Sequence, residues 1–232
     1  TRLPQLKEIG MITDAIWRDL VNDNAMDLLV VGEWMTVEVF TNEGGKFSPA
    51  TEQFGLAGYE GWWNCLRAGD FDGDGDLDLI VGNHGLNSRF DASSEKPLKM
   101  YVNDFDRNGK AEQVVAYYEN DELLPFVRLP ELTMQLPKIK KNYLRFSSYM
   151  GQTMEDVFGK EALDKSVELT VKHLQTSILV NEGDKFKVGS LPVEVQLSPV
   201  FGLAISDFDK DGNQDILMGG NFSRSKPEVG KY

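Results

Sequence analysis

Nine-residue acidic segments, each followed by a short apolar run, recur along this chain and constrain its fold more than any other feature. The clearest reads DFDGDGDLD from Asp70 to Asp78, and DFDKDGNQD at 207–215 repeats it position for position. DFDRNGKAE at 104–112 is a looser copy, and DLVNDNAMD at 19–27 is degenerate, with Val21 in the third position. An internal repeat of this kind predicts a fold built from similar supersecondary units.

The segments around these loops predict short strands. MDLLVVG, LDLIVG, QVVAY and DILMG follow the four loops and are nearly continuous apolar runs, typical of strands buried on both faces. NEGGKF from Asn42 and NEGDKF from Asn181 predict hairpin turns, with glycine supplying positive φ. Four antiparallel strands per repeat are typical of a propeller blade. The sequence therefore predicts an all-β fold, a β-propeller or partial propeller of about four blades of four-stranded antiparallel sheets.

The spacing of the loops is uneven. Their first aspartates are separated by 51, 34 and 103 residues, so we expect a shortened blade and then a blade that carries an insertion. Helical composition between 129 and 166 predicts a small α-helical insertion within a blade, with Thr153 and Asp156 as a capping pair. We assign 1–232 to a single propeller domain. Because about four blades are few for a closed propeller, we expect a partial one or a piece of a longer protein.

The charge of the chain is concentrated in the loops. The formal net charge is −13, and omitting the 15 carboxylates of the four loop windows would change it to +2. Phosphate binding needs clustered Lys and Arg, so the composition argues against nucleic acid and against an anionic membrane surface. Cys65 is the only cysteine, which excludes an intrachain disulfide. No apolar run reaches 18 residues, so no membrane span is predicted.

The acidic loops are candidate calcium sites. Carboxylates at positions 1, 3, 5 and 9 of a tight turn converge and repel one another unless a cation lies between them. Ca²⁺ accepts 6–8 oxygen ligands, and position 7 is expected to add a backbone carbonyl. The predicted metal-site residues are Asp70, Asp72, Asp74, Asp76, Asp78, Asp104, Asp106, Asn108, Lys110, Glu112, Asp207, Asp209, Asp211, Asn213 and Asp215.

Two other kinds of metal site, an EF-hand and a magnesium site, fit the acidic loops less well. An EF-hand needs a glutamate at position 12 and flanking helices, whereas position 12 here is Val81, Val115 or Met218 within an apolar run. Mg²⁺ suits an all-protein oxygen cage less well than Ca²⁺ does. The sequence thus predicts two to three calcium sites. A fourth at Asp19, Asp23 and Asp27 is the weakest candidate, because Val21 removes one ligand.

These motifs carry a resemblance. DFDGDGDLDLIVGN, DFDKDGNQDILMGGN and NEGDKF resemble the FG-GAP/VCBS repeats of integrin-α-like β-propellers. The wider pattern, including EGWWNCLRAG, LTMQLPKIKKNY and LPVEVQLSPVFG, resembles a bacterial VCBS-repeat family related to the ASPIC/UnbV and cartilage acidic protein group. The resemblance implies a secreted, periplasmic or cell-surface propeller with structural Ca²⁺ in its DxDxDGxxD loops.

The predicted function is binding rather than catalysis. No nucleophile elbow, P-loop or His-Glu-x-x-His motif occurs, and the carboxylates are better explained as metal ligands than as a glycosidase pair. We expect a non-catalytic module that binds a protein or a glycan; the alternatives are an accessory domain of a larger carbohydrate-active enzyme and a purely structural scaffold. Trp62, Trp63 and His84 are candidate ligand-binding residues, although inter-blade packing is the commoner use of such tryptophans.

Overall fold

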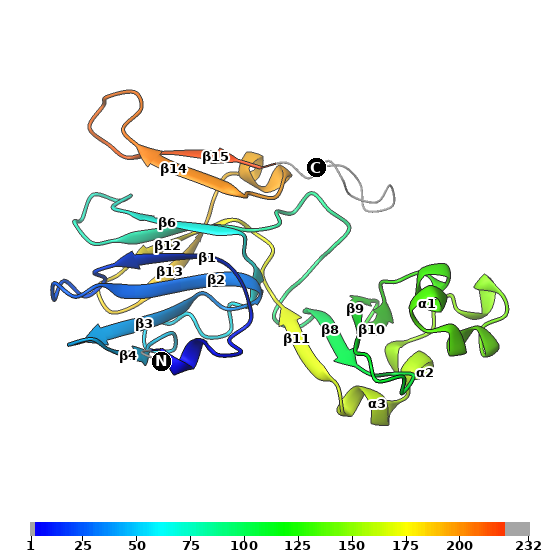
Figure 1. Ribbon diagram of the computed structural model, residues 1–232. Coiled ribbons are helices and arrows are strands. Elements are labelled where there is room, and N and C mark those ends of the chain that lie inside the picture. The colour runs from blue at the N-terminus through cyan, green and yellow to red at the C-terminus, as the bar shows by residue number, and fades with distance from the viewer. Residues whose placement is uncertain (1–2, 221–232) are drawn as a thin grey trace. The chain divides into compact units, whose positions relative to one another are not determined.

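The computed structural model describes residues 3–220 and shows two compact units. The first unit runs up to Arg89 and resumes at His173, and the second comprises Phe90–Lys172 (Figure 1). The second unit is therefore an insertion into the sequence of the first. Each unit has its own sheets and its own buried clusters, and each is described separately below.

The first unit contains three antiparallel sheets. The first two have the order β1-β2-β3-β4, with β5 added beside β2, and β13-β12-β7-β6, while β14 pairs with β15. The strands are β1 Met11–Arg18, β2 Asp27–Met35, β3 Glu38–Glu43, β4 Lys46–Pro49, β5 Gly61–Trp62, β6 Cys65–Gly69, β7 Asp78–Gly82, β12 Ser177–Asn181, β13 Phe186–Ser190, β14 Gly202–Ser206 and β15 Asp215–Gly219. Two short 3₁₀ helices, Pro4–Leu6 and Val193–Leu197, complete the unit.

These sheets have the arrangement expected of neighbouring blades in a partial propeller. The first strands of the three sheets lie next to one another, because β6 contacts both β1 and β14 (Figure 1). Two of the strands that follow the acidic loops are buried on both faces as predicted, β7 along its whole length and β2 along nearly all of it. The prediction is wrong for the other two: β9 alternates between buried and more exposed residues, and β15, which pairs only with β14 among the described residues, has no buried residue. The predicted all-β class and four-stranded antiparallel sheets are thus confirmed.

The apolar core of the first unit lies between the first two sheets. Leu29 and Val31 of β2 pack in one cluster with Leu79 and Val81 of β7, and Trp63 is buried among them. A second cluster, with Ile80 and Val200 among its members, joins the second sheet to β14 and β15. Burying side chains from both faces of β7 fixes the place of the second sheet between its neighbours.

A buried aspartate joins each complete sheet to its acidic loop. Asp27 and Asp78, the ninth residues of their loops, are fully buried. One carboxylate oxygen of Asp78 accepts a hydrogen bond from Phe71 N at 2.9 Å, and the other accepts one from Asn181 N at 2.8 Å. Asp27 does the same with Leu20 N at 2.9 Å and Asn42 N at 2.8 Å. The asparagine of each Asn-Glu-Gly motif is therefore the residue that connects the third strand to the loop.

The second unit is a sheet with helices packed on it. Its strand order is β10-β9-β8-β11, so β11 pairs with the first strand, β8, instead of following β10. The strands are β8 Leu98–Asn103, β9 Glu112–Glu119, β10 Glu122–Pro125 and β11 Val167–Val171. The helices are α1 Leu129–Gln135, α2 Met154–Phe158 and α3 Lys160–Asp164, with 3₁₀ turns at Pro137–Lys141 and Phe146–Ser148. The predicted capping pair is confirmed, because Thr153 and Asp156 form a capping box at α2.

The structure places the Asp104 loop differently from the loop-spacing argument. That argument gave the Asp70 loop a shortened blade and gave the Asp104 loop a blade of its own that carries the insertion. Instead, β12 pairs with β7, with Leu179 opposite Leu79, so the hairpin of β12 and β13 completes the sheet of the Asp70 loop. The Asp104 loop belongs to the inserted unit, which also contains the helical segment 129–166. Spacing alone misleads here because the insertion divides one sheet between its second and third strands.

We predict that Asp78→Asn destabilises the first unit even without metal. Asparagine turns one acceptor oxygen into an N–H₂ donor, which leaves Phe71 N or Asn181 N facing a donor in a buried site. We expect a loss of about 2–3 kcal/mol in the free energy of unfolding. Urea unfolding followed by tryptophan fluorescence in excess chelator measures it. Asp76→Asn in the same loop is the control, and equal stability of the two variants contradicts the prediction.

We also predict that the first unit folds without the insertion. Gly85 N donates to Leu174 O at 2.7 Å and Asn83 Nδ2 donates to His173 O at 3.0 Å, so the chain enters and leaves the insertion side by side. Replacing 90–172 by a short Gly-Ser linker should therefore retain a cooperative unfolding transition. All four tryptophans lie in the first unit, so their fluorescence reports on it alone. A non-cooperative transition would show that the insertion is needed for folding.

Candidate metal centres

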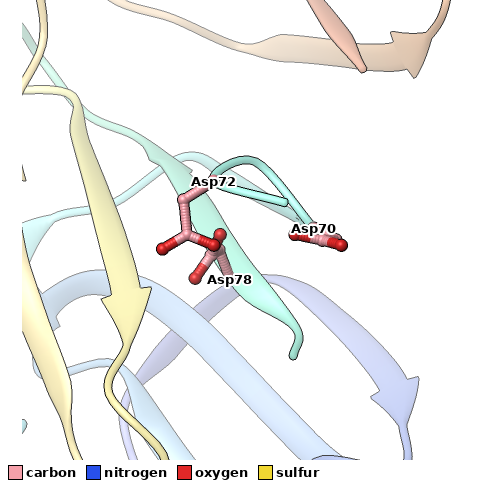
Figure 2. Close-up of side chains that lie close together, drawn as sticks. All are labelled: Asp70, Asp72 and Asp78. Atoms are coloured by element: carbon pink, nitrogen blue, oxygen red, sulfur yellow. The ribbon is translucent and has the colours of Figure 1, made fainter. Parts of the chain in front are cut away.

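Three of the four acidic loops bring carboxylate oxygens together. Each loop connects the first and second strands of a hairpin, and its ninth residue begins the second strand. In each set, one carboxylate oxygen per residue lies within 4.8 Å of those of the other two (Figure 2 for the first set). The sets are Asp70, Asp72 and Asp78; Asp104, Asp106 and Glu112; and Asp207, Asp209 and Asp215. Positions 1, 3 and 9 of the predicted sites are thus brought together in all three.

The first residue of every loop shapes the turn through backbone hydrogen bonds. The two oxygens of Asp104 accept hydrogen bonds from Asn108 N and Gly109 N, both at 2.8 Å. Asp207 accepts the equivalent pair, from Asp211 N at 3.1 Å and Gly212 N at 3.0 Å. These glycines have φ values of 86° and 96°, which are readily adopted only by glycine. The sixth-position glycine predicted for a sharp turn is therefore required by the backbone.

The ninth residue holds the loop at its other end. In all four loops its carboxylate accepts a hydrogen bond from the N–H of the second residue, at 2.8–3.0 Å. Glu112 does this with Phe105 N, so the longer side chain still reaches the position that aspartate fills elsewhere. The glutamate at 112 therefore preserves the loop geometry and lies buried like Asp27 and Asp78.

The side chains at position 5 contact the backbone of their own loops. Asp74 Oδ1 accepts from Asp76 N at 2.9 Å, Asn108 Oδ1 from Lys110 N at 2.9 Å, and Asp211 Oδ1 from Asn213 N at 2.8 Å. The hydrogen bonds from Asn213 lower the pKa of Asp211 below its ordinary value. In the structure these fifth-position side chains close a local turn and do not join the three-carboxylate sets.

The first loop has the same frame without the third carboxylate. Asp19 accepts hydrogen bonds from Asp23 N at 3.1 Å and Asn24 N at 2.8 Å, as the first residue of the other loops does. Asn24 adopts φ 65°, close to the glycines at the sixth position. The third residue, Val21, is exposed and offers no oxygen. Within residues 3–220, Asp19, Asp23 and Asp27 form no set of converging carboxylates.

The carboxylate at loop position 3 takes the smallest part in the hydrogen bonds that shape the loop. Asp72 has its pKa raised, first by desolvation and also by the nearby charges of Asp74 and Asp78. Asp106 Oδ1 is buried and lacks a hydrogen-bond partner among the described residues. A buried carboxylate oxygen without a donor is costly unless a cation or another donor compensates it. These two residues therefore provide the oxygens that suit a cation best.

The candidate ligand-binding aromatics divide between core and surface. Trp63 is only 1% exposed and belongs to the core between the first two sheets. Trp62 is half-buried, stacks on His84 with ring centroids 5.1 Å apart, and lies 5.4 Å from Trp34. Burial lowers the pKa of His84 below its ordinary value. The Trp62–His84 pair is thus an aromatic cluster of the first unit, and Trp34 belongs to it although sequence reasoning did not single it out.

One contact near the Asp104 loop could not have been found from the sequence. Lys138 Nζ, in the 3₁₀ turn after α1, donates a hydrogen bond to the carbonyl oxygen of Asp106. The two residues are 32 positions apart, and no local pattern links a lysine in a helical segment to a loop. The contact joins the helical segment to the carboxylate set of the Asp104 loop within the second unit.

The comparisons with known proteins agree with the repeat. No curated protein has a sequence that matches the chain. Across residues 3–220, none of the helices has the length and apolar character needed to cross a membrane. Residues 19–81, which contain the first acidic loop, strands β2 to β6 and the whole Asp70 loop, match the family model described as an FG-GAP-like repeat.

Proposed function

We propose that this chain is a calcium-stabilised, non-catalytic β-propeller module that binds a protein or a glycan outside the cytoplasm. The observation that carries the proposal is the recurrence of three converging carboxylates on one loop frame, three times among residues 3–220. The FG-GAP-like match over residues 19–81 supports a repeat module of this type.

Calcium suits these sites by charge and by ligand type. Three carboxylates whose oxygens lie within 4.8 Å repel one another, and the raised pKa of Asp72 reflects such crowding together with desolvation. A hard cation that accepts several oxygens relieves this repulsion. Asp106 Oδ1, buried without a donor, gives the same indication in the second unit. The residues present therefore fit a calcium ion at positions 1, 3 and 9.

The proposed role of the ion is to stabilise the fold. The carboxylates of positions 1 and 9 already hold the two ends of the loop and, in the Asp70 loop, the third strand of the sheet. An ion bound to the same carboxylates adds its binding free energy to the folded state. At about ten times Kd this contributes about 1.4 kcal/mol per site. Loops of moderate affinity suit the high calcium concentration outside cells, which supports a secreted, periplasmic or cell-surface location.

Binding rather than catalysis is the proposed activity of the module. Its clustered carboxylates are accounted for by the loops, and the Trp62–His84 pair offers an aromatic surface of the kind that stacks on sugars or anchors a partner. Glycan-array and pull-down assays in calcium test this part of the proposal. If Trp62→Ala loses a ligand that the parent chain retains, while Trp17→Ala at an exposed position keeps it, the binding surface lies at Trp62.

We predict that chelation lowers the melting temperature and that calcium restores it. Within each set the carboxylates repel one another when no ion is bound, and the ion removes this penalty. Asp72→Val, which copies Val21 of the first loop, should remove one calcium from the stoichiometry measured by calorimetry. It should also leave the melting temperature in chelator nearly unchanged, because Asp72 makes only one local hydrogen bond. An identical melting curve with calcium and with chelator, with no metal found by elemental analysis, contradicts the proposal.

We further predict that Val21→Asp creates an additional calcium site. The first loop already has the hydrogen bonds of Asp19 and Asp27 and the left-handed residue Asn24, and it lacks only the third carboxylate. The variant should bind one calcium more than the parent chain, measured by calorimetry. Val21→Thr, which is uncharged and similar in size, is the control. An unchanged stoichiometry in Val21→Asp would show that the third carboxylate alone does not make a site.

A further inference from the structure

A cavity lies beside the carboxylate set of the Asp104 loop, inside the second unit. Its volume is about 240 Å³, and it lies between the Asp104 loop, the segment after α1 and the end of α2. The residues that line it are Phe105, Asp106, Arg107, Leu136, Lys138, Ile139, Asn142, Val157 and Phe158. Asp106 belongs both to the wall of this cavity and to the carboxylate set of the loop.

The walls of the cavity are mainly apolar and aromatic. Phe105 and Phe158 contact each other with ring centroids 4.5 Å apart. Both pack against the buried clusters of the unit while remaining partly exposed, as Ile139 and Val157 also do. Small-molecule sites typically combine such walls with a few polar groups, and this cavity lies below their usual range of about 300–1,000 Å³, so it suits a small ligand.

Two cations lie in the cavity wall. Lys138 donates to the carbonyl oxygen of Asp106, which holds its ammonium group near the loop. Arg107 is the fourth residue of the loop, where the Asp70 loop has Gly73. Both adopt positive φ, 58° for Arg107 and 82° for Gly73, so the loop carries an arginine where glycine fits more easily. Asp106 is the only acidic residue among those that line the cavity.

The formal net charge of the Asp104 loop differs from that of the other two loops with converging carboxylates. Its three acidic residues are matched by Arg107, Lys110 and the bound Lys138, so the site is formally neutral when empty and +2 with one calcium. The Asp70 loop carries five aspartates and no cation, and is −3 with calcium. The Asp207 loop carries four aspartates and Lys210, and is −1 with calcium. Of these three, only the Asp104 loop becomes positive when it holds the ion.

We propose that this cavity binds a small organic anion, an aromatic or otherwise flat carboxylate, when calcium occupies the Asp104 loop. The apolar body lies against Phe105 and Phe158, and the carboxylate faces Lys138 and Arg107. Calcium takes the formally neutral site to +2, so an anion is attracted to the loaded site and gains little at the empty one. This inference rests on the proposed calcium binding of the same loop.

The test compares two probes that differ in charge. Naphthalene-2-carboxylate and naphthalene-2-carboxamide are titrated into the full chain, in calcium and in excess chelator, and followed by calorimetry. We expect the carboxylate to bind at least about tenfold tighter than the amide in calcium, and to lose about tenfold in chelator, since hydrogen bonds to charged groups contribute about 1.5–3 kcal/mol. Equal affinity of the two probes in calcium overturns the proposal, and so does equal affinity of the carboxylate with and without calcium.

Matched lysine variants assign the contact. Lys138→Gln should weaken carboxylate binding about tenfold, whereas Lys140→Gln, an exposed neighbour that does not line the cavity, should leave it unchanged. Arg107→Gln is a second variant that keeps the Lys138 contact and should also weaken binding. Circular dichroism and calcium stoichiometry verify that the variants stay folded and loaded. Equal carboxylate affinity in Lys138→Gln, Arg107→Gln and the parent overturns the assignment.

Calcium titration of Asp106→Val separates this proposal from the one on which it rests. If the variant binds one calcium fewer than the parent but the parent does not bind the carboxylate, the anion site is wrong and the calcium site stands. If the variant and the parent bind the same number of calcium ions, the calcium site at this loop is wrong, and the calcium-dependent anion site is overturned with it.

Discussion

A buried carboxylate at the ninth position of the first two loops, Asp27 and Asp78, is the interaction on which the two complete sheets of the first unit depend. Asp78 lies at the start of β7 and accepts one hydrogen bond from its own loop and another from Asn181 at the end of β12. It therefore ties together two segments more than 100 residues apart in sequence. Because its burial is complete, both bonds are needed to compensate the desolvated charge. The recurrence of this arrangement at Asp27 and Asn42 explains why the acidic loop and the Asn-Glu-Gly turn recur together.

The four loops separate the requirements of folding from those of metal binding. The first loop keeps the hydrogen bonds of positions 1 and 9 and the left-handed sixth residue, although its third residue is valine. The loop frame thus forms without a carboxylate at position 3. In the three other loops, the carboxylate at position 3 is therefore available to bind an ion. This is why the third position, and not the first or ninth, distinguishes ion binding from folding.

Sequence reasoning found the features that are local and missed those that depend on long-range pairing. The loops, the buried strands and the capping box of Thr153 are encoded within about ten residues, so their residue types predict them. The pairing of β7 with β12 depends on contacts across the insertion, so loop spacing wrongly predicted a shortened blade for the Asp70 loop. Carboxylates at positions 1, 3 and 9 were predicted correctly to converge, whereas the local bonds of Asp74 and Asp211 follow from turn geometry that residue type does not reveal.

The insertion reuses the acidic loop in a different electrostatic setting. Glu112 preserves the bond to the second residue, so the loop geometry survives in a sheet whose fourth strand, β11, pairs with the opposite edge from that of a blade. No Asn-Glu-Gly asparagine is needed there, and the loop is instead contacted by Lys138 of the helical segment. Arg107, Lys110 and Lys138 make the loaded site formally positive, whereas the Asp70 and Asp207 loops stay negative with one calcium. A loop that serves stability in the blades thereby acquires the charge and the adjoining cavity that recognition of an anion requires.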